Sequence, residues 1–375
     1  MRAIELFAGA GGLGIGVSRA GFHPSLIVER DRWCCDTLRE NRASLGHDHP
    51  WPLPSESDIR SVDFRTEEGK VVLVTGGPPC QPFSMGGKHM AHADHRDMWS
   101  EAVRVVREVR PKAFIFENVR GLARQSFASY LGYILLQLQH PSVVKRDGED
   151  WPDHLKRLQR HHTGSGIPEY RVVHEVLDAA DYGVAQRRHR VVFVGFRADV
   201  NAGWCFPRPT HSAAALAATR ASGEYWDRHK VAKRDRPQAV GFPRLAPLPD
   251  RPWITVRDAL AGLPDPRSDA ASAWHNHRFQ DGARSYPGHT GSLIDLPAKA
   301  LKAGVHGVPG GENMMRLPDG SIRYFTVREA ARLQAFPDSW RFHGSWSEAM
   351  RQLGNAVPTT LGEVVASSVR RHLEP

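Results

Sequence analysis

Short apolar runs alternate with amphipathic stretches through the first half of the chain. The apolar runs predict strands at residues 2–7, 25–29, 71–75, 113–117, 170–177 and 190–195. Between two of them, apolar positions from Trp99 to Val109 keep helical spacing behind a capping Asp97, and Pro111 ends this helix. Strands that alternate with helices are typical of βα units. We therefore expect a doubly wound α/β fold with a mostly parallel sheet.

The alternation stops in the second half. From about residue 198 to 323, prolines, glycines, Trp and His occur without a clear period. Helices then return: Thr326 with Glu329, and Ser345 with Glu348, form two capping boxes, and Gly354 is expected to end the second helix. These patterns predict one domain from residues 1–200 with 346–375, and a smaller, irregular second domain at 201–345.

Composition limits the class of protein. Of 375 residues, 41% are hydrophobic and 24% charged, and no 18-residue apolar run occurs that could span a membrane. The first residues lack the apolar stretch of a secretory signal, so we expect a cytoplasmic protein. The four cysteines, Cys34, Cys35, Cys80 and Cys205, have neither zinc-site nor disulfide-scaffold spacing. We expect reduced thiols and no metal.

The net charge of +9 is unevenly distributed. Residues 187–257 hold 14 Lys and Arg against 5 Asp and Glu, an excess of nine that equals the whole net charge. Such an excess fits either a solvated face or a surface that contacts phosphates. The charge alone does not choose between these two interpretations.

A glycine-rich turn follows the first predicted strand. Gly9, Gly11 and Gly14 match the GxGxxG pattern of nucleotide-binding turns, and Glu29 ends the next strand, where it could bind ribose hydroxyls. The pattern does not separate a dinucleotide from S-adenosylmethionine, and glycines needed only for close helix packing remain an alternative.

A cysteine between prolines is the strongest chemical signal. Cys80, in the run GGPPCQPFS, follows a predicted strand and so lies at the edge where open α/β sheets bind ligands. The prolines restrict the backbone and thereby the direction of the thiol. Glu117 ends the next strand, where burial would raise its pKa, and Arg188 and Arg190 precede another strand and could anchor that carboxylate, a base or a phosphate.

Six motifs occur together in one order: FAGAGG, GGPPCQPFS, FENV, QRRHR, RLQAFPD and QLGNAVP. In this order and spacing, the chain resembles the DNA cytosine-5 methyltransferases, over most of its length outside residues 125–165 and 200–290. The resemblance implies S-adenosylmethionine as cofactor, Cys80 as nucleophile, Glu117 as catalytic glutamate, and Arg188 and Arg190 as active-site arginines. It also implies a set of cofactor-binding residues: Phe7, Gly9, Gly11, Gly12, Glu29, Asp58, Ile59 and Asn355.

The resemblance further implies duplex DNA as substrate, read by residues 201–345 as a target-recognition domain. We expect Gln81, Ser84 and Arg328 to contact DNA, and the target cytosine to be rotated out of the helix. We also expect the chain to be a monomer and to have a partner restriction endonuclease that acts on the same DNA site. The sequence departs from the family pattern at Glu5, where Asp is commoner, and at Ala335, where Gly is common.

Three other functions remain open. An RNA cytosine methyltransferase of the same fold would use the same catalytic residues, but it would not need the sizeable second domain. A dehydrogenase would use Gly9 to Gly14 and Glu29 for NAD but would leave GGPPCQPFS unexplained. A DNA-binding protein without catalysis is disfavoured because Cys80, Glu117 and Arg188 are all present.

Overall fold

The computed structural model describes all residues except 44–49, 80–97, 165, 238–249, 304–311 and 375. The chain divides into two compact units. The first unit consists of Met1–Leu177, His189–Phe206 and Gly362–Pro375, and the second of Asp178–Arg188 and Pro207–Leu361. The functional division expected at residues 200 and 346 stays a prediction.

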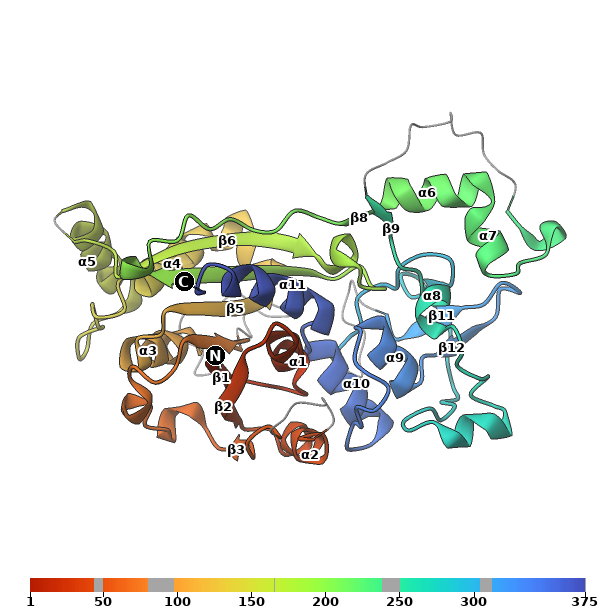
Figure 1. Cartoon of the computed structure of the whole chain (residues 1–375), viewed down its shortest axis with the longest axis horizontal. Coiled ribbons are helices and arrows are strands. Elements are labelled where there is room, and N and C mark those ends of the chain that lie inside the picture. Colours follow the sequence, from red (N-terminus) through yellow and green to blue (C-terminus); the bar gives the residue numbers. More distant parts are fainter. Residues whose placement is uncertain (44–49, 80–97, 165, 238–249, 304–311, 375) are drawn as a thin grey trace. The chain divides into compact units, whose positions relative to one another are not determined.

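A seven-stranded sheet forms the centre of the first unit, in the order β3-β2-β1-β4-β5-β7-β6 (Figure 1). The pairs among β3, β2, β1, β4 and β5 are parallel, and β7 runs antiparallel to β5. All six predicted strands are present, which confirms the doubly wound, mostly parallel sheet. The strands are β1 (Arg2–Leu6), β2 (His23–Glu29), β3 (Ser55–Glu56), β4 (Leu73–Gly76), β5 (Ala113–Val119), β6 (Tyr170–Asp178) and β7 (His189–Arg197).

The two faces of the sheet in the first unit carry different side chains, and helices of that unit pack against them. Trp99 of α3 packs edge-on against Phe116 and Phe193, in a core that also holds Ile4 and Leu6. Alternate residues of a strand face opposite ways, so Glu5 points to the other face, where it meets α1. The helices are α1 (Gly12–Arg19), α2 (Arg32–Glu40), α3 (Trp99–Val109), α4 (Ala128–Gln139), α5 (Trp151–Thr163) and α11 (Thr359–Arg370), whose first three residues belong to the second unit.

The second unit contains little regular structure, as expected from its sequence. Its helices are α6 (Ala213–Ser222), α7 (Glu224–Arg228), α8 (Val256–Leu260), α9 (Val327–Leu333) and α10 (Trp346–Asn355). Its strands are β8 (His211–Ser212), β9 (Arg251–Pro252), β10 (Ser292–Leu293), β11 (Met314–Arg316) and β12 (Ile322–Tyr324).

The predicted caps of α9 and α10 agree only partly with the observed helix ends. The box of Thr326 and Glu329 is complete at α9. At α10, the Ser345 hydroxyl accepts from the Glu348 N–H, but the helix continues to Asn355, so the prediction that Gly354 ends it is wrong. Gly354 is needed for space instead, since a Cβ there would lie 2.3 Å from the Ala303 nitrogen.

No helix in the described part of the chain is both long and apolar enough to cross a membrane.

Candidate active site

The glycine-rich turn between β1 and α1 is built from left-handed backbone. Gly9 and Gly11 have φ values of 55° and 84°, and Gly11 caps α1. Phe7 also has a positive φ of 52°, which costs energy for a side chain with a Cβ. Strain of this kind persists where the surroundings impose it, often at binding sites. The turn thus has the backbone shape that the sequence predicted for a cofactor loop.

Glu29 fixes this turn to the end of β2. Its Oε2 accepts the Gly9 N–H at 2.7 Å, and its Oε1 accepts the N–H groups of Arg30 and Asp31, also at 2.7 Å. Each carboxylate oxygen has two lone-pair directions, so acceptor capacity for a hydroxyl remains on Oε2. The predicted ribose contact is compatible with this geometry and stays a prediction.

Glu5 lies under the turn and is 2% exposed. Its Oε1 accepts the Gly14 N–H at 2.9 Å, and a Cβ on Gly14 would lie 1.9 Å from Oε2. Among the described residues, Oε2 has no hydrogen-bond partner. Burial raises the pKa of Glu5 to about 8, and the neighbouring Glu29 adds to the rise. An orphaned buried carboxyl oxygen beside the turn fits a ligand that carries a cationic amine.

Asp58 and Ile59 follow β3 but have other partners. Asp58 accepts two side-chain hydrogen bonds from Arg60, at 2.9 and 2.6 Å, and these hold the pKa of its carboxyl well below the usual range. Ile59 is 4% exposed and packs in the core of the first unit. A hydrogen bond from the adenine amine of the cofactor to Asp58 would add to the ion pair between Asp58 and Arg60 or replace it.

Glu117 and Arg190 form a buried ion pair at the ends of β5 and β7. Arg190 Nε lies 2.5 Å from Glu117 Oε1, and the two side chains are 11% and 9% exposed. Burial lowers the pKa of Arg190, while the charge of Glu117 opposes that change. The predicted anchoring of Glu117 by an arginine of QRRHR is therefore present through Arg190.

The motifs GGPPCQPFS and FENV meet at this ion pair. A Cβ on Gly77 would lie 3.2 Å from Glu117 Oε2, and the Asn118 amide donates to the Pro78 carbonyl at 2.8 Å. The Met98 N–H donates to the carbonyl of Pro79 at 3.2 Å. Asn118 and Gly77 were not singled out in the sequence, although FENV and GGPPC contain them. The first residues of the proline-rich run are thus held beside the carboxylate.

Three predicted residues, Cys80, Gln81 and Ser84, lie outside the described residues. Their roles as nucleophile and DNA contacts stay predictions.

Arg188 has partners different from those of Arg190. It is 1% exposed, and its guanidinium donates to the carbonyls of Leu301 and Gly354 at 3.3 and 2.5 Å, within the second unit. Asn355, the next residue after Gly354, is exposed at the end of α10. The Arg188 side chain therefore joins the segments around Leu301 and Gly354 within the second unit. Its catalytic role stays a prediction.

Arg328 is also buried, at 0% exposure. It donates to the carbonyls of His275, Pro337 and Trp340 at 3.1, 3.1 and 2.6 Å, and burial lowers its pKa. Its predicted contact with DNA would require this side chain to leave three carbonyls.

In the described ranges, no three His, Cys, Asp or Glu side chains cluster closely enough to hold a metal ion.

Comparison with protein families defines the class. The model of the family described as "C-5 cytosine-specific DNA methylase" matches residues 1–140, 151–236 and 270–371. The chain belongs to this family. Enzymes of this family transfer a methyl group from S-adenosylmethionine to cytosine in DNA, and this chain is a DNA (cytosine-5)-methyltransferase with that cofactor.

Individual relatives cover the chain almost completely. Type II methyltransferase M.PspPI of Psychrobacter sp. (strain TA137) is 32% identical over 373 residues, which is 99% of this chain and 79% of that protein. Type II methyltransferase M.NgoMIV of Neisseria gonorrhoeae is 27% identical, covering 99% of this chain and 98% of that protein. The crystal structure of S. pombe Dnmt2 methyltransferase superposes with a TM-score of 0.58 at 17% identity, covering 100% of this chain and 98% of that one, and shows the same fold.

Proposed function

We propose that the chain methylates C5 of a cytosine rotated out of duplex DNA, through a covalent bond between the Cys80 sulfur and C6 of the base. The observation that carries this proposal is the buried Glu117–Arg190 pair, with Gly77 beside the carboxylate and Pro78 held by Asn118. Because Cys80 follows Pro79 in the sequence, this arrangement supports a thiol and an acid acting on the same base.

Each side chain has a defined task in this reaction. C5 of cytosine is a weak nucleophile, so the ring must first gain electron density. The Cys80 thiolate forms an S–C6 bond while Glu117 donates a proton to N3, which makes C5 an enamine carbon. After methyl transfer, a base removes the C5 proton, the S–C6 bond breaks, and N3 returns its proton. Arg190 keeps Glu117 in place.

The cofactor supplies an electrophilic methyl group on a sulfonium when it is bound. We assign its binding to Phe7, Gly9, Gly11, Gly12, Glu29, Asp58, Ile59 and Asn355. Glu29 offers the remaining acceptor capacity of Oε2 to ribose hydroxyls, and the orphaned oxygen of Glu5 offers a partner for the amine. The roles of Asp58, Ile59 and Asn355 rest on the family motifs alone.

DNA reading is assigned to residues 201–345, most of which belong to the second unit. The excess of nine positive charges in residues 187–257 supports binding to phosphates, and base contacts would supply the sequence specificity. Because its relatives are Type II methyltransferases, we further propose that the chain is the modification enzyme paired with a restriction endonuclease that cuts the same site, and that it acts as a monomer.

A labelled methyl donor tests the proposal. Purified chain is incubated with S-adenosylmethionine carrying a tritiated methyl group and with either duplex DNA or RNA. We expect label on DNA alone, at a cytosine that bisulfite sequencing of a randomised duplex library identifies. Label on RNA alone would overturn the assignment of the substrate.

The matched variant is Cys80→Ser, with Cys205→Ser as the control for an exposed thiol elsewhere in the chain. The first variant should lose methyl transfer and should fail to form a stable adduct with DNA that contains 5-fluorocytosine, whereas the control should keep both. Equal labelling by Cys80→Ser and the unmodified chain contradicts the covalent mechanism.

A further inference from the structure

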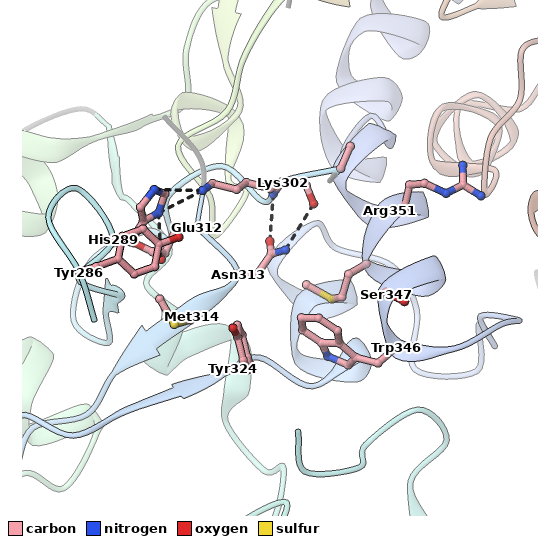
Figure 2. A pocket seen from close by; sticks show the side chains of 12 residues that line it. Tyr286, His289, Lys302, Glu312, Asn313, Met314, Tyr324, Trp346, Ser347 and Arg351 are labelled. Carbon is pink, nitrogen blue, oxygen red and sulfur yellow. Dashed lines mark hydrogen bonds and ion pairs between the residues drawn. The ribbon is translucent and has the colours of Figure 1, made fainter. Parts of the chain in front are cut away.

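A hollow of about 100 Å³ lies within the second unit, between β11, α10 and the segment that precedes residue 304 (Figure 2). One side carries aromatic rings, among them Tyr324 and Trp346. The other side carries Lys302 with His289 and Glu312. Among the described residues, none of the predicted catalytic or cofactor-binding residues lines this hollow.

The aromatic side is held rigidly. The Tyr324 and Trp346 rings lie 5.0 Å apart at 58°, and Trp346 Nε1 donates to the Phe325 carbonyl at 3.1 Å. Met314 and Met350, which are 4% and 2% exposed, lie against the same hollow. Because these rings and thioethers are already ordered, a planar ligand could pack on them at little cost in side-chain entropy.

The polar side presents an amine. Lys302 Nζ lies 3.0 Å from His289 Nδ1, and Figure 2 shows both side chains turned to the same side of the hollow. Glu312 is 1% exposed, accepts from Lys299 Nζ at 3.2 Å, and lies 3.8 Å from His289 Nδ1. Partial burial lowers the pKa of Lys302. An ammonium group has three donors, so Lys302 has capacity for an acceptor atom beyond the imidazole.

The backbone around Lys302 is also fixed. Asn313 accepts from the Lys302 N–H at 2.9 Å, and its amide nitrogen lies 3.5 Å from the Lys302 carbonyl (Figure 2). Arg351 also lines the hollow, but its guanidinium pairs with Glu348 at 2.7 Å. Among the described lining residues, Lys302 is therefore the lysine or arginine that has no carboxylate partner within 4 Å.

Size and chemistry together define the class of ligand. A cavity of about 150 Å³ holds benzene, so a hollow of about 100 Å³ takes the edge of a ring and not a whole ring or a whole cofactor. Lys302 disfavours a cation and favours an acceptor such as a ring carbonyl. Aromatic rings stack on bases whatever their sequence. These features fit the edge of a single nucleobase.

We propose that this hollow receives the edge of one unstacked nucleobase of the bound DNA, whose ring lies against Tyr324 and Trp346 and whose carbonyl oxygen faces Lys302. The inference rests on the proposed function, because it presumes that the second unit binds DNA. It adds a second base-binding site, distinct from the one for the target cytosine. Unstacking a base costs free energy, and a pocket that receives it offsets part of that cost.

Photo-crosslinking locates the base directly. A duplex library with 5-iodouracil at varied positions is bound to the full chain and irradiated, and crosslinked peptides are identified by mass spectrometry. We expect crosslinks to Tyr324 or Trp346. Crosslinks that map only to other parts of the chain overturn the proposal. Crosslinking does not require methyl transfer, so a chain that crosslinks here but methylates no DNA would contradict the proposed function and not this site.

A thermodynamic cycle separates base binding from a structural role. Tyr324→Leu and Lys302→Met should weaken DNA binding, the first by roughly 5- to 100-fold, as expected for one lost stack. Lys233→Met, an exposed lysine in the same unit, controls for the lost charge and should change binding by roughly threefold or less.

An abasic nucleotide at the crosslinked position should weaken binding to the unmodified chain to a similar extent, and should weaken binding to Tyr324→Leu by less than about twofold, because both changes remove the same contact. If the two losses multiply, the base does not lie on Tyr324 and the proposal is wrong. Thermal unfolding of both variants shows whether the fold is kept, and Lys302→Met, which removes no ring from the core, must repeat the non-multiplying result.

Discussion

Arginine side chains of low exposure have one kind of partner in the first unit and two kinds in the second. In the first unit, Arg190 meets the carboxylate of Glu117 at the ends of two strands. In the second unit, Arg323 pairs with Glu329, but Arg188 and Arg328 donate to backbone carbonyls, five between them. A sheet satisfies its own backbone groups, whereas an irregular chain leaves buried carbonyls that need side-chain donors. The irregular unit therefore uses Arg188 and Arg328 to satisfy its own backbone, a task for which the sheet of the first unit needs no side chain.

The largest effect should follow from removing the acid of the first unit. Glu117→Gln keeps the shape of the side chain but cannot donate a proton as a carboxylic acid, so we expect methyl transfer to fall about 10²- to 10⁴-fold. The exposed Glu175→Gln in the same sheet should leave the rate unchanged. Single-turnover rates at saturating DNA measure the loss. A rate close to that of the unmodified chain would mean that Glu117 does not take part in the proton transfer.

The second prediction uses the other buried acid of the first unit. The folded state raises the pKa of Glu5 from 4.5 to about 8. Below pH 4.5, Glu5 is protonated in both the folded and the unfolded chain, and its full contribution to stability is present. As the pH rises towards 8, Glu5 loses its proton first in the unfolded chain, and this contribution is lost. Relative to Glu5→Gln, the unmodified chain should lose about 3–5 kcal/mol between pH 5 and 8.

Urea unfolding of both proteins across that pH range measures the difference. Parallel pH profiles would show that Glu5 is ionised in the folded chain throughout.

In the second unit, the corresponding change is Arg328→Met, which leaves three buried carbonyls without their donor. Each unsatisfied acceptor costs about 1–3 kcal/mol, and with some relaxation we expect the free energy of unfolding to fall by about 3 kcal/mol. Arg284→Met, at an exposed position, should change it by less than about 0.5 kcal/mol.

Denaturant unfolding compares the two variants. DNA binding measured on the folded fraction then tests the predicted Arg328 contact, since a loss of affinity without loss of stability would assign the side chain to DNA.

The smallest effect concerns backbone shape in the second unit. Ala335 has a φ of 60°, where the family often has glycine. A residue with a Cβ loses about 1–2 kcal/mol in this conformation, and glycine loses about 0.4–1 kcal/mol in chain entropy. Ala335→Gly should therefore stabilise the chain by about 0.5–1 kcal/mol. Ala331→Gly, inside α9, should destabilise it by about 1 kcal/mol, and the same sign for both variants would rule out this explanation.

Much of the first unit could be predicted from the sequence. Local periodicity decides strands and helices, so all six predicted strands appear. The glycine turn and Glu29 were also recognisable because a strand, a turn and an acid follow one another at short range. In the second unit, the cap of α9 could be predicted from Thr326 and Glu329, but most of the unit was predicted only as irregular, since its many turns follow no period.

The sequence by itself determined the family, the order of the motifs and the fold class, because each depends on residue types at fixed spacing. Only the tertiary structure decided which arginine of QRRHR meets Glu117, since Arg188 and Arg190 are chemically identical and two residues apart. It also decided that Arg328 donates to backbone carbonyls and that Lys302, Tyr324 and Trp346 line one hollow. Such partners are set by contacts between distant segments, and no local pattern in the chain encodes them.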